Sequence, residues 1–346
     1  MTVYEIDPTR DSRWDEFLET HPDASIFHTR GWLEALQRTY GYVPVAFTTS
    51  PPGYRLANGV PFCEISSWIS GRRLVSLPFS DLCTPLVENS EQLTCVLDYL
   101  RDKIPLEKWS YIELRPTGSV LTGPADFGKT EIFFLHKLDL RPSLDEIFRN
   151  FHRDCVQRKI QRAEREGLVY EEGRSDSLLT KFYNLLLMTR RRHGLPAQPV
   201  DWFRNLISYL GEKANIRVAS KNGWPIAGIF TLRYRHVLVY KYGCSDRRFS
   251  NMGGTQSLFW RAIQDAKKDQ LSEFDMGRSD CDNHGLVAFK DRWGATKTEL
   301  TYFRHPVRNS SAVAKAGRTL ISKYVWPYAP RSVLVAAGRT LYKYMG

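Results

Sequence analysis

The sequence lacks several features that would assign a class at once. Its six cysteines are scattered, with no C-x-x-C pair and no cluster with histidine, which argues against structural zinc and for reduced thiols in the cytoplasm. No run of about 18 apolar residues occurs, so we expect no transmembrane helix. The charged first residues are not expected to act as a signal peptide. No Ser/His/Asp or Cys/His arrangement stands out, so a covalent intermediate is not indicated.

What the chain does have is length and positive charge. Its 346 residues are 42% hydrophobic and 25% charged, a composition that suits two globular domains. Lys and Arg number 49 against 38 Asp and Glu, so the net charge is +11. This excess favours polyanionic partners, namely phosphate-rich cofactors, RNA or an anionic membrane surface. Eight basic residues and no acidic residue follow Glu299, and Ala316–Leu320 recurs as Ala337–Leu341, which predicts a basic tail of two short amphipathic helices over 307–346.

Strand-like and helix-like stretches alternate along the chain, and the pattern starts again after Arg141. Ser143 is a natural N-cap with Glu146 as its capping-box partner, which predicts one long helix over 144–165. Strands interleaved with helices favour the α/β class with mixed sheets, in two tandem domains at 1–142 and 143–306. We expect strands at 3–6, 43–48, 56–65, 74–78, 111–114, 132–138, 216–220, 226–233, 236–242, 273–276 and 298–303, and further helices at 13–20, 32–40, 91–103, 177–192, 202–213 and 255–268.

Residues 247–255 follow an expected strand and open an expected helix. Backbone N–H groups at a helix N-terminus are unpaired and the helix dipole is positive there, so glycine and arginine at this place suit a phosphate. Arg248-x-x-Asn251-x-Gly253, followed by Gly254, is similar to the loop that holds coenzyme A in GNAT acyltransferases, with Asn251 in place of a glycine. The resemblance implies that these four residues bind the donor. The alternative is an ordinary helix N-terminus capped by Gly and Thr.

A second candidate site joins Asp275 and Arg278, at the end of an expected strand, to Phe289 and Lys290 further along the chain. A lysine held among aromatic side chains is partly desolvated and keeps its donors at the tip. Such a donor suits the oxyanion that forms when an amine attacks an ester or thioester. Asp275 is a candidate general base, and Arg278 is a candidate for placing an anionic substrate. The alternative is a surface lysine beside a core Phe289.

The same segments carry a family resemblance. F-D-M-G-R-S at 274–279, followed by G-L-V-A-F-K-D-R-W-G at 285–294, looks like the signature of FemAB-like proteins with a GNAT-type domain. Further motifs of that family are similar to stretches that occur here in the same order: S-I-F-H-T with W-L at 25–33, S-L-P-F-S-D at 76–81, R-R-H-G-L-P at 191–196 and K-Y-G at 241–243.

The resemblance implies two tandem GNAT-like domains. It also implies transfer of an aminoacyl group from charged tRNA to a peptidoglycan precursor, or a related envelope or exopolysaccharide reaction. Phe289 and Lys290 match the pair that lies at the family's reaction centre. The long coiled insert with which some Fem members bind tRNA is not seen here. Acyl-CoA and aminoacyl-tRNA therefore both stay open as co-substrates, and we expect neither a tightly bound cofactor nor a metal.

The remaining candidates are substrate-binding residues. Arg192 and His193 would contact an anionic acceptor such as a diphosphate, or they simply cap a helix end. Asp81 would orient an amine, or it forms an Asx turn. Tyr242 lies in a motif that the resemblance places near substrate. The basic helix expected at 149–165 is either a solvated outer face or a groove for RNA or phosphate.

We therefore predict an acyl- or aminoacyltransferase that acts on an amine or hydroxyl of a cell-envelope precursor, which is in some cases lipid-linked, by direct attack. The alternative is a non-catalytic GNAT-fold module that binds RNA or anionic lipid through its basic surface. We expect the transferase to lie in the cytoplasm, with its tail at 307–346 docking on the inner face of the membrane. Packing of that tail on the protein, or disorder, is the other outcome.

Overall fold

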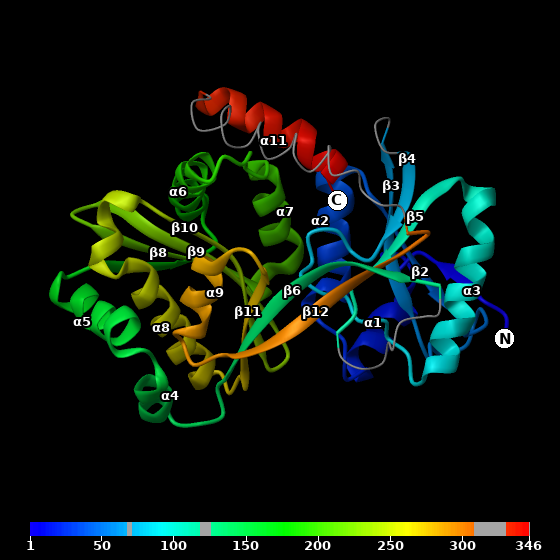
Figure 1. The fold of residues 1–346 in the computed structure, drawn as a ribbon, viewed down its shortest axis with the longest axis horizontal. Coiled ribbons are helices and arrows are strands. Elements are labelled where there is room, and N and C mark those ends of the chain that lie inside the picture. Colours follow the sequence, from blue (N-terminus) through cyan, green and yellow to red (C-terminus); the bar gives the residue numbers. More distant parts are fainter. Residues whose placement is uncertain (68–70, 118–125, 308–329, 346) are drawn as a thin grey trace. The chain divides into compact units, whose positions relative to one another are not determined.

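The computed structural model describes residues 1–67, 71–117, 126–307 and 330–345 (Figure 1). The chain forms two compact units. The first contains Met1–Ile132, the segment that begins at Leu300 and the residues from Thr340. The second contains Phe133–Glu299 and the C-terminal helix up to Arg339. The domain boundaries that we expect at 142/143 and 306/307 stay predictions.

The first unit is a sheet with helices packed on it. Its elements are β1 Tyr4–Ile6, α1 Ser12–Thr20, a 3₁₀-helix at Ile26–His28, α2 Arg30–Tyr40, β2 Val43–Thr48, β3 Val60–Ser67, β4 Gly71–Val75, α3 Ser90–Glu107, β5 Trp109–Leu114 and the end of β12 Thr296–His305. The strand order is β1-β2-β3-β4-β5-β12, with every pair antiparallel except β4 and β5. The apolar positions of α2 recur at helical spacing and are buried, and the helix ends where Gly41 takes a left-handed φ of 72°.

The second unit has helices on both faces of its sheet (Figure 1). Its elements are the later part of β6 Gly128–Asp139, α4 Leu144–Asn150, a π-helix at Arg153–Gln157, α5 Arg158–Arg165, β7 Val169–Gly173, α6 Asp176–Arg192, α7 Val200–Leu210, a 3₁₀-helix at Gly211–Lys213, β8 Ala214–Lys221, β9 Trp224–Tyr234, β10 Val237–Ser245, a 3₁₀-helix at Arg247–Met252, α8 Gly254–Lys268, β11 Glu273–Asp280 and α9 His284–Asp291. Neighbouring residues of β9 show the two faces: Ile229 packs in a core with Phe259 of α8, and the Phe230 ring packs at a tilt against Phe182 of α6.

Both units follow one plan. Antiparallel strands lead to a parallel pair joined by a helix, β4–α3–β5 in the first unit and β10–α8–β11 in the second. One more antiparallel strand then borders that pair: β12 pairs with β5, and β6 pairs with β11. This arrangement confirms the predicted α/β class with mixed sheets. It also shows that the strand bordering each parallel pair comes from the other half of the sequence pattern. The pattern assigns β12 to the second half and β6 to the first.

The prediction of one long helix over 144–165 is wrong. Ser143 does cap a helix, since its Oγ accepts the Glu146 N–H at 3.2 Å, but α4 ends at Asn150. His152 then starts a new helical segment, because its Nδ1 accepts the backbone N–H groups of residues 154 and 155. Gln157 donates its side-chain N–H to carbonyl groups at the end of α4, which stabilises the break.

The short elements that were not expected from the sequence include β7 and α9. The edge strand β7 has five residues, and α9 has eight residues and opens at Asn283, whose side chain accepts the Leu286 N–H. Short elements give few repeats of an apolar pattern, which is why periodicity misses them. The omission matters because α9 carries Phe289 and Lys290.

Half of the predicted basic tail lies outside the described residues, namely its first helix. The second is α11 Arg331–Met345. Its face at Leu334, Gly338 and Tyr342 is buried, and a Cβ on Gly338 would lie 1.9 Å from the carbonyl oxygen of Ala197. The end of the helix is held in the first unit, where Tyr42 donates its hydroxyl to the Tyr342 carbonyl at 2.7 Å. Its apolar face therefore packs on the protein, and exposed Arg339 and Lys343 lie outside that face.

His28 makes a prediction about acid stability. The imidazole is fully buried: Nε2 donates to the Thr84 carbonyl at 2.9 Å, and Nδ1 accepts the Ser25 N–H at 3.1 Å. Burial lowers its pKa from 6.5 to about 4. Because the unfolded chain takes up the proton first, we expect stability to fall as pH drops from about 6.5 to about 4, by on the order of 3 kcal/mol.

Urea unfolding of the wild type and of His28→Gln at pH 7 and pH 4.5 measures this effect. The variant lacks the titrating group, so its stability should depend less on pH than that of the wild type over this window. Equal pH dependence in the two proteins would contradict the assignment.

Candidate active site

In the second unit, the parallel strands β10 and β11 pair with each other only at their N-terminal ends. β10 and β11 are paired at Val237–Val239 with Glu273–Asp275, and both strands then continue without pairing to each other. Each carries a register shift just beyond this point, between Tyr240 and Tyr242 in β10 and between Asp275 and Arg278 in β11. We call the place where the pairing of β10 and β11 stops the branch point. Beyond it, the facing backbone groups of the two strands need hydrogen-bond partners other than each other.

Lys290 supplies such a partner. Its side chain is 2% exposed, and its ammonium donates to the carbonyl groups of Gly277 at 2.7 Å and Arg278 at 3.0 Å. Gly277 has a left-handed φ of 71°, and its N–H donates to Asp275 Oδ1 at 2.7 Å. Asp275 and Lys290 together fix the bulge of β11 at the branch point. Of the two interpretations of Lys290, a surface position is excluded.

The bulge also sets the direction of Arg278. Asp275 faces Lys137 and Arg278 faces Leu135 in the antiparallel register with β6, so Asp275 and Arg278 lie on the same face of the sheet. Asp275 is 5% exposed, and the guanidinium of Arg278 lies 4.1 Å from the ring centroid of Phe133. The sequence-predicted acid and cation are therefore brought together. Lys290 reaches the same stretch of backbone from α9.

Phe289 has an anchoring position. Its ring packs edge-on against Phe259 of α8, with centroids 5.6 Å apart, and near Trp293 at 6.2 Å. These rings belong to the core of the second unit. Phe289 therefore fixes α9 against α8, next to the lysine.

The predicted phosphate loop is a 3₁₀-helix followed by α8. Arg248 is paired with buried Asp246 at 2.7 Å, and its hydrogen bond holds the pKa of that carboxyl below its usual value. Asn251 lies in the 3₁₀-helix, and Gly253 takes the left-handed φ of 75°. A Cβ on Gly253 would lie 2.0 Å from the carbonyl oxygen of Lys159, so this glycine is also required for the packing of α5. Gly254 begins α8 directly after it.

The end of α6 meets this loop. Arg192 donates to the Ser245 carbonyl at 3.1 Å and contributes to the lowered pKa of Asp246 after Arg248. Burial, and then the charges of Arg192 and Arg190, lowers the pKa of His193. The structure thus brings Arg192 and Arg248 to the same end of β10.

Two other predicted residues lie apart from this group. Tyr242 is 7% exposed, its hydroxyl accepts the Trp202 indole N–H at 2.8 Å, and its ring packs on Phe203. It is a core residue on the α6 and α7 face. Asp81 belongs to the first unit, where its carbonyl group accepts the Tyr302 hydroxyl at 2.6 Å.

The loop that contains Asp81 has an unusual backbone. Leu77 and Phe79 have positive φ values of 28° and 61°, and neither is glycine. Arg115 donates to the Leu77 carbonyl at 3.2 Å, and the Ser80 hydroxyl donates to the same carbonyl at 2.6 Å. These two hydrogen bonds support the positive φ of Leu77 in the stretch S-L-P-F-S-D.

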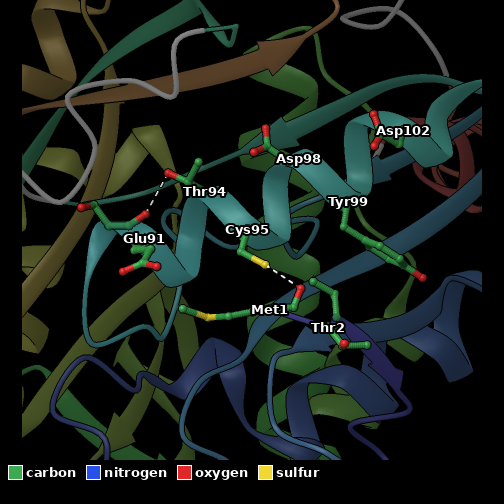
Figure 2. A pocket seen from close by; sticks show the side chains of 10 residues that line it. Met1, Thr2, Glu91, Thr94, Cys95, Asp98, Tyr99 and Asp102 are labelled. Atoms are coloured by element: carbon green, nitrogen blue, oxygen red, sulfur yellow. Dashed lines mark hydrogen bonds between the residues drawn. The ribbon is translucent and has the colours of Figure 1, made fainter.

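A groove of about 750 Å³ lies along α3 in the first unit (Figure 2). Its lining includes the carboxylates of Glu91, Asp98 and Asp102, and Cys95 contacts the Met1 carbonyl through its thiol. None of the sequence-predicted site residues lines it. Its negative charge disfavours a phosphate-bearing donor, so we assign it no role.

Within the described ranges, no three His, Cys, Asp or Glu side chains gather as a metal site requires. No helix of that part of the chain is long and apolar enough to cross a bilayer.

Comparison with known families decides the class of the second unit. Residues 150–291 match the family model of the acetyltransferase (GNAT) domain, and this stretch includes β10, α8, β11 and α9. Residues 150–291 of the chain are therefore a domain of the acetyltransferase (GNAT) type. The predicted resemblance to FemAB-like GNAT acyltransferases and the predicted enzyme class are confirmed.

Solved structures agree on the fold around this GNAT domain. FemX superimposes with a TM-score of 0.70 at 16% identity, covering 93% of this chain and 100% of FemX. The C-terminal domain of a putative lysylphosphatidylglycerol synthetase from Agrobacterium fabrum gives 0.55 at 14% identity, with coverages of 94% and 99%. A tandem GNAT protein from the clavulanic acid biosynthesis pathway gives 0.53 at 11%, with coverages of 88% and 97%. No curated protein matches the sequence.

Sequence reasoning missed two features of the second unit. One is the role of Gly277, whose left-handed φ creates the bulge that receives Lys290; the M-G-R run after a strand was the available signal. The other is His136, whose partner Asp291 lies 155 residues away in the chain, so no local pattern could reveal the pair.

Proposed function

We propose that this GNAT domain transfers an acyl or aminoacyl group from acyl-CoA or aminoacyl-tRNA to an amine or hydroxyl of a cell-envelope precursor. The observation that carries the proposal is the buried ammonium of Lys290, fixed at the point where β10 and β11 part. The names of the structural neighbours support envelope chemistry, because one is FemX and another is a putative lysylphosphatidylglycerol synthetase.

In the proposed reaction the acceptor attacks the donor carbonyl directly. The carbonyl oxygen becomes an oxyanion in the tetrahedral intermediate, and the Lys290 ammonium stabilises that charge. The bond to the leaving sulfur or oxygen then breaks, and the leaving group takes up the proton that the acceptor loses. Asp275, which lies beside the Gly277 N–H, is the candidate that receives this proton first.

Positive charge would bind the two substrates. The helix dipole favours donor phosphates at the N-terminal end of α8. This end carries Gly253 and Gly254, and the 3₁₀-helix just before it carries Arg248 and Asn251. Arg192 and His193 meet that end from α6, and Arg278 lies on the Asp275 face of β11. We assign acceptor contacts to these three residues, and the role expected of Asp81 in the first unit stays a prediction. Tyr242 would support the site through packing.

The location that we propose is the inner face of the membrane. The apolar face of α11 packs on the protein, so its exposed Arg339 and Lys343 would attract anionic lipid by charge rather than by insertion. This attachment would keep the enzyme near a lipid-linked acceptor.

Thermal unfolding with single ligands tests the donor. We expect coenzyme A or bulk charged tRNA to raise the melting temperature, because a ligand at a hundred times its dissociation constant adds about 2.7 kcal/mol of stability. Arg248→Ala should reduce the shift. A shift with uncharged RNA or phosphatidylglycerol vesicles alone would contradict the transferase and favour the non-catalytic alternative.

A further inference from the structure

His136 on β6 is a buried polar residue that the proposed reaction leaves without a role. Its side chain is 0% exposed, and Nε2 lies 3.0 Å from Asp291 Oδ1 on α9. Because a carboxylate only accepts, Nε2 carries the proton and donates it. Among the described residues, Nδ1 has no hydrogen-bond partner, although it is shielded from solvent.

This arrangement is unfavourable for packing alone. A buried acceptor without a donor costs about 1–3 kcal/mol, and a phenylalanine would fill a similar space without that cost. The bond to Asp291 is therefore the feature of His136 that needs an explanation.

Asp291 stands next to Lys290 on α9, and three consecutive side chains of this helix contact three different elements. Phe289 packs on Phe259 of α8, Lys290 binds the carbonyl groups of the β11 bulge, and Asp291 binds His136 of β6. Successive residues of a helix point about 100° apart, so these contacts together fix its rotation about its own axis.

The fixed rotation matters because α9 is short and Lys290 is long. A helix of eight residues has little stability of its own, and a small rotation is magnified at the end of the lysine stem. Asp291 limits that rotation through His136 on one oxygen and through Lys297 at 3.4 Å on the other. The Lys297 side chain is 40% exposed, so the buried partner is the stronger constraint.

The uncharged form of the His136 imidazole also suits a position near the Lys290 ammonium. Burial lowers the pKa of His136, and the nearby charges of Lys290 and Lys297 lower it further, while Asp291 opposes them. A neutral ring adds no repulsion to the ammonium of Lys290. It can therefore hold Asp291 without displacing the lysine.

We propose that His136 is a positioning residue, which acts through Asp291 and α9 to keep the Lys290 ammonium on the carbonyl groups of the β11 bulge. The inference rests on the proposed function of Lys290 in acyl transfer. His136 touches no reacting atom in this proposal.

The test compares His136→Phe, which keeps the ring shape and removes the donor, with His136→Gln, which keeps an N–H donor. Lys297→Met is the matched control, because it removes the exposed partner of Asp291. Transfer is measured from acetyl-CoA and from bulk tRNA charged with labelled amino acids. We expect His136→Phe to lower kcat by about 10- to 100-fold with KM unchanged, the effect of a small misplacement of a catalytic group. His136→Gln and Lys297→Met should stay close to wild type.

Reductive methylation followed by mass spectrometry gives a second measurement that needs no substrate. Lys290 should be protected in the wild type and in Lys297→Met, and it should be labelled faster in His136→Phe. If His136→Phe does not fold, Asp291→Ala, at a side chain 41% exposed, removes the same bond and should show the same faster labelling. Unchanged labelling of Lys290 together with unchanged kcat would overturn the proposal. If Lys290→Ala keeps full turnover, the proposed catalytic function of Lys290 is wrong. Faster labelling of Lys290 in His136→Phe would still show that His136 positions this side chain.

Discussion

Replacing Lys290 by alanine should reduce the rate of acyl transfer by roughly 10²–10³-fold, which corresponds to about 2.7–4 kcal/mol of transition-state stabilisation. The reason is that an oxyanion donor acts mainly on the transition state, so kcat should fall and KM should change little. Initial rates of transfer from acetyl-CoA and from bulk charged tRNA measure the effect.

Lys290 also binds two carbonyl groups of β11, so loss of structure must be separated from loss of the donor. Lys290→Met keeps the length of the apolar stem and should lose as much activity as Lys290→Ala. Added methylamine should partly restore the alanine variant, since a small cation can enter the space left by the side chain. A folded Lys290→Ala protein with full turnover would exclude Lys290 from catalysis.

The sequence was sufficient for the elements that have long and regular patterns. β2 lies at Val43–Thr48 as predicted, and α6 and α8 begin within one residue of their predicted starts. Their apolar residues repeat over several turns or alternate along a strand, and that repeat is a local property.

The sequence was insufficient where distant segments decide the structure. Gln157 and His152 interrupt the helix predicted over 144–165 by side-chain contacts to backbone, which no periodicity records. The strands β6 and β12 each join the unit opposite to their place in the pattern. Pairing partners depend on the whole fold, and local propensity does not encode them.

The candidate site shows the same division. Lys290, Asp275 and Arg278 could be selected from their residue types and motif, and the structure brings all three to the bulge of β11. That Lys290 binds backbone carbonyl groups follows from the left-handed turn at Gly277. The pair of His136 and Asp291 depends on the antiparallel contact of β6 with β11, which forms only in the folded chain.

Replacing Gly253 by alanine should destabilise the second unit by about 2–5 kcal/mol. About 1–2 kcal/mol comes from the left-handed backbone, where φ is 75°, and about 1–3 kcal/mol from the new Cβ, which would lie 2.0 Å from the Lys159 carbonyl oxygen. Chemical denaturation of the wild type and the variant measures the difference.

Gly167 supplies the matched control, because its φ is 61° and nothing lies within 4 Å of a Cβ placed there. Gly167→Ala should therefore cost only the backbone part, about 1–2 kcal/mol. The excess cost of Gly253→Ala measures the contact between α5 and the start of α8, the helix end that we propose for donor phosphates. If both variants lose the same stability, α5 does not hold this loop. Gly253 would then be required only for its left-handed turn. A smaller coenzyme A-induced rise in melting temperature in Gly253→Ala would then report weaker donor binding alone.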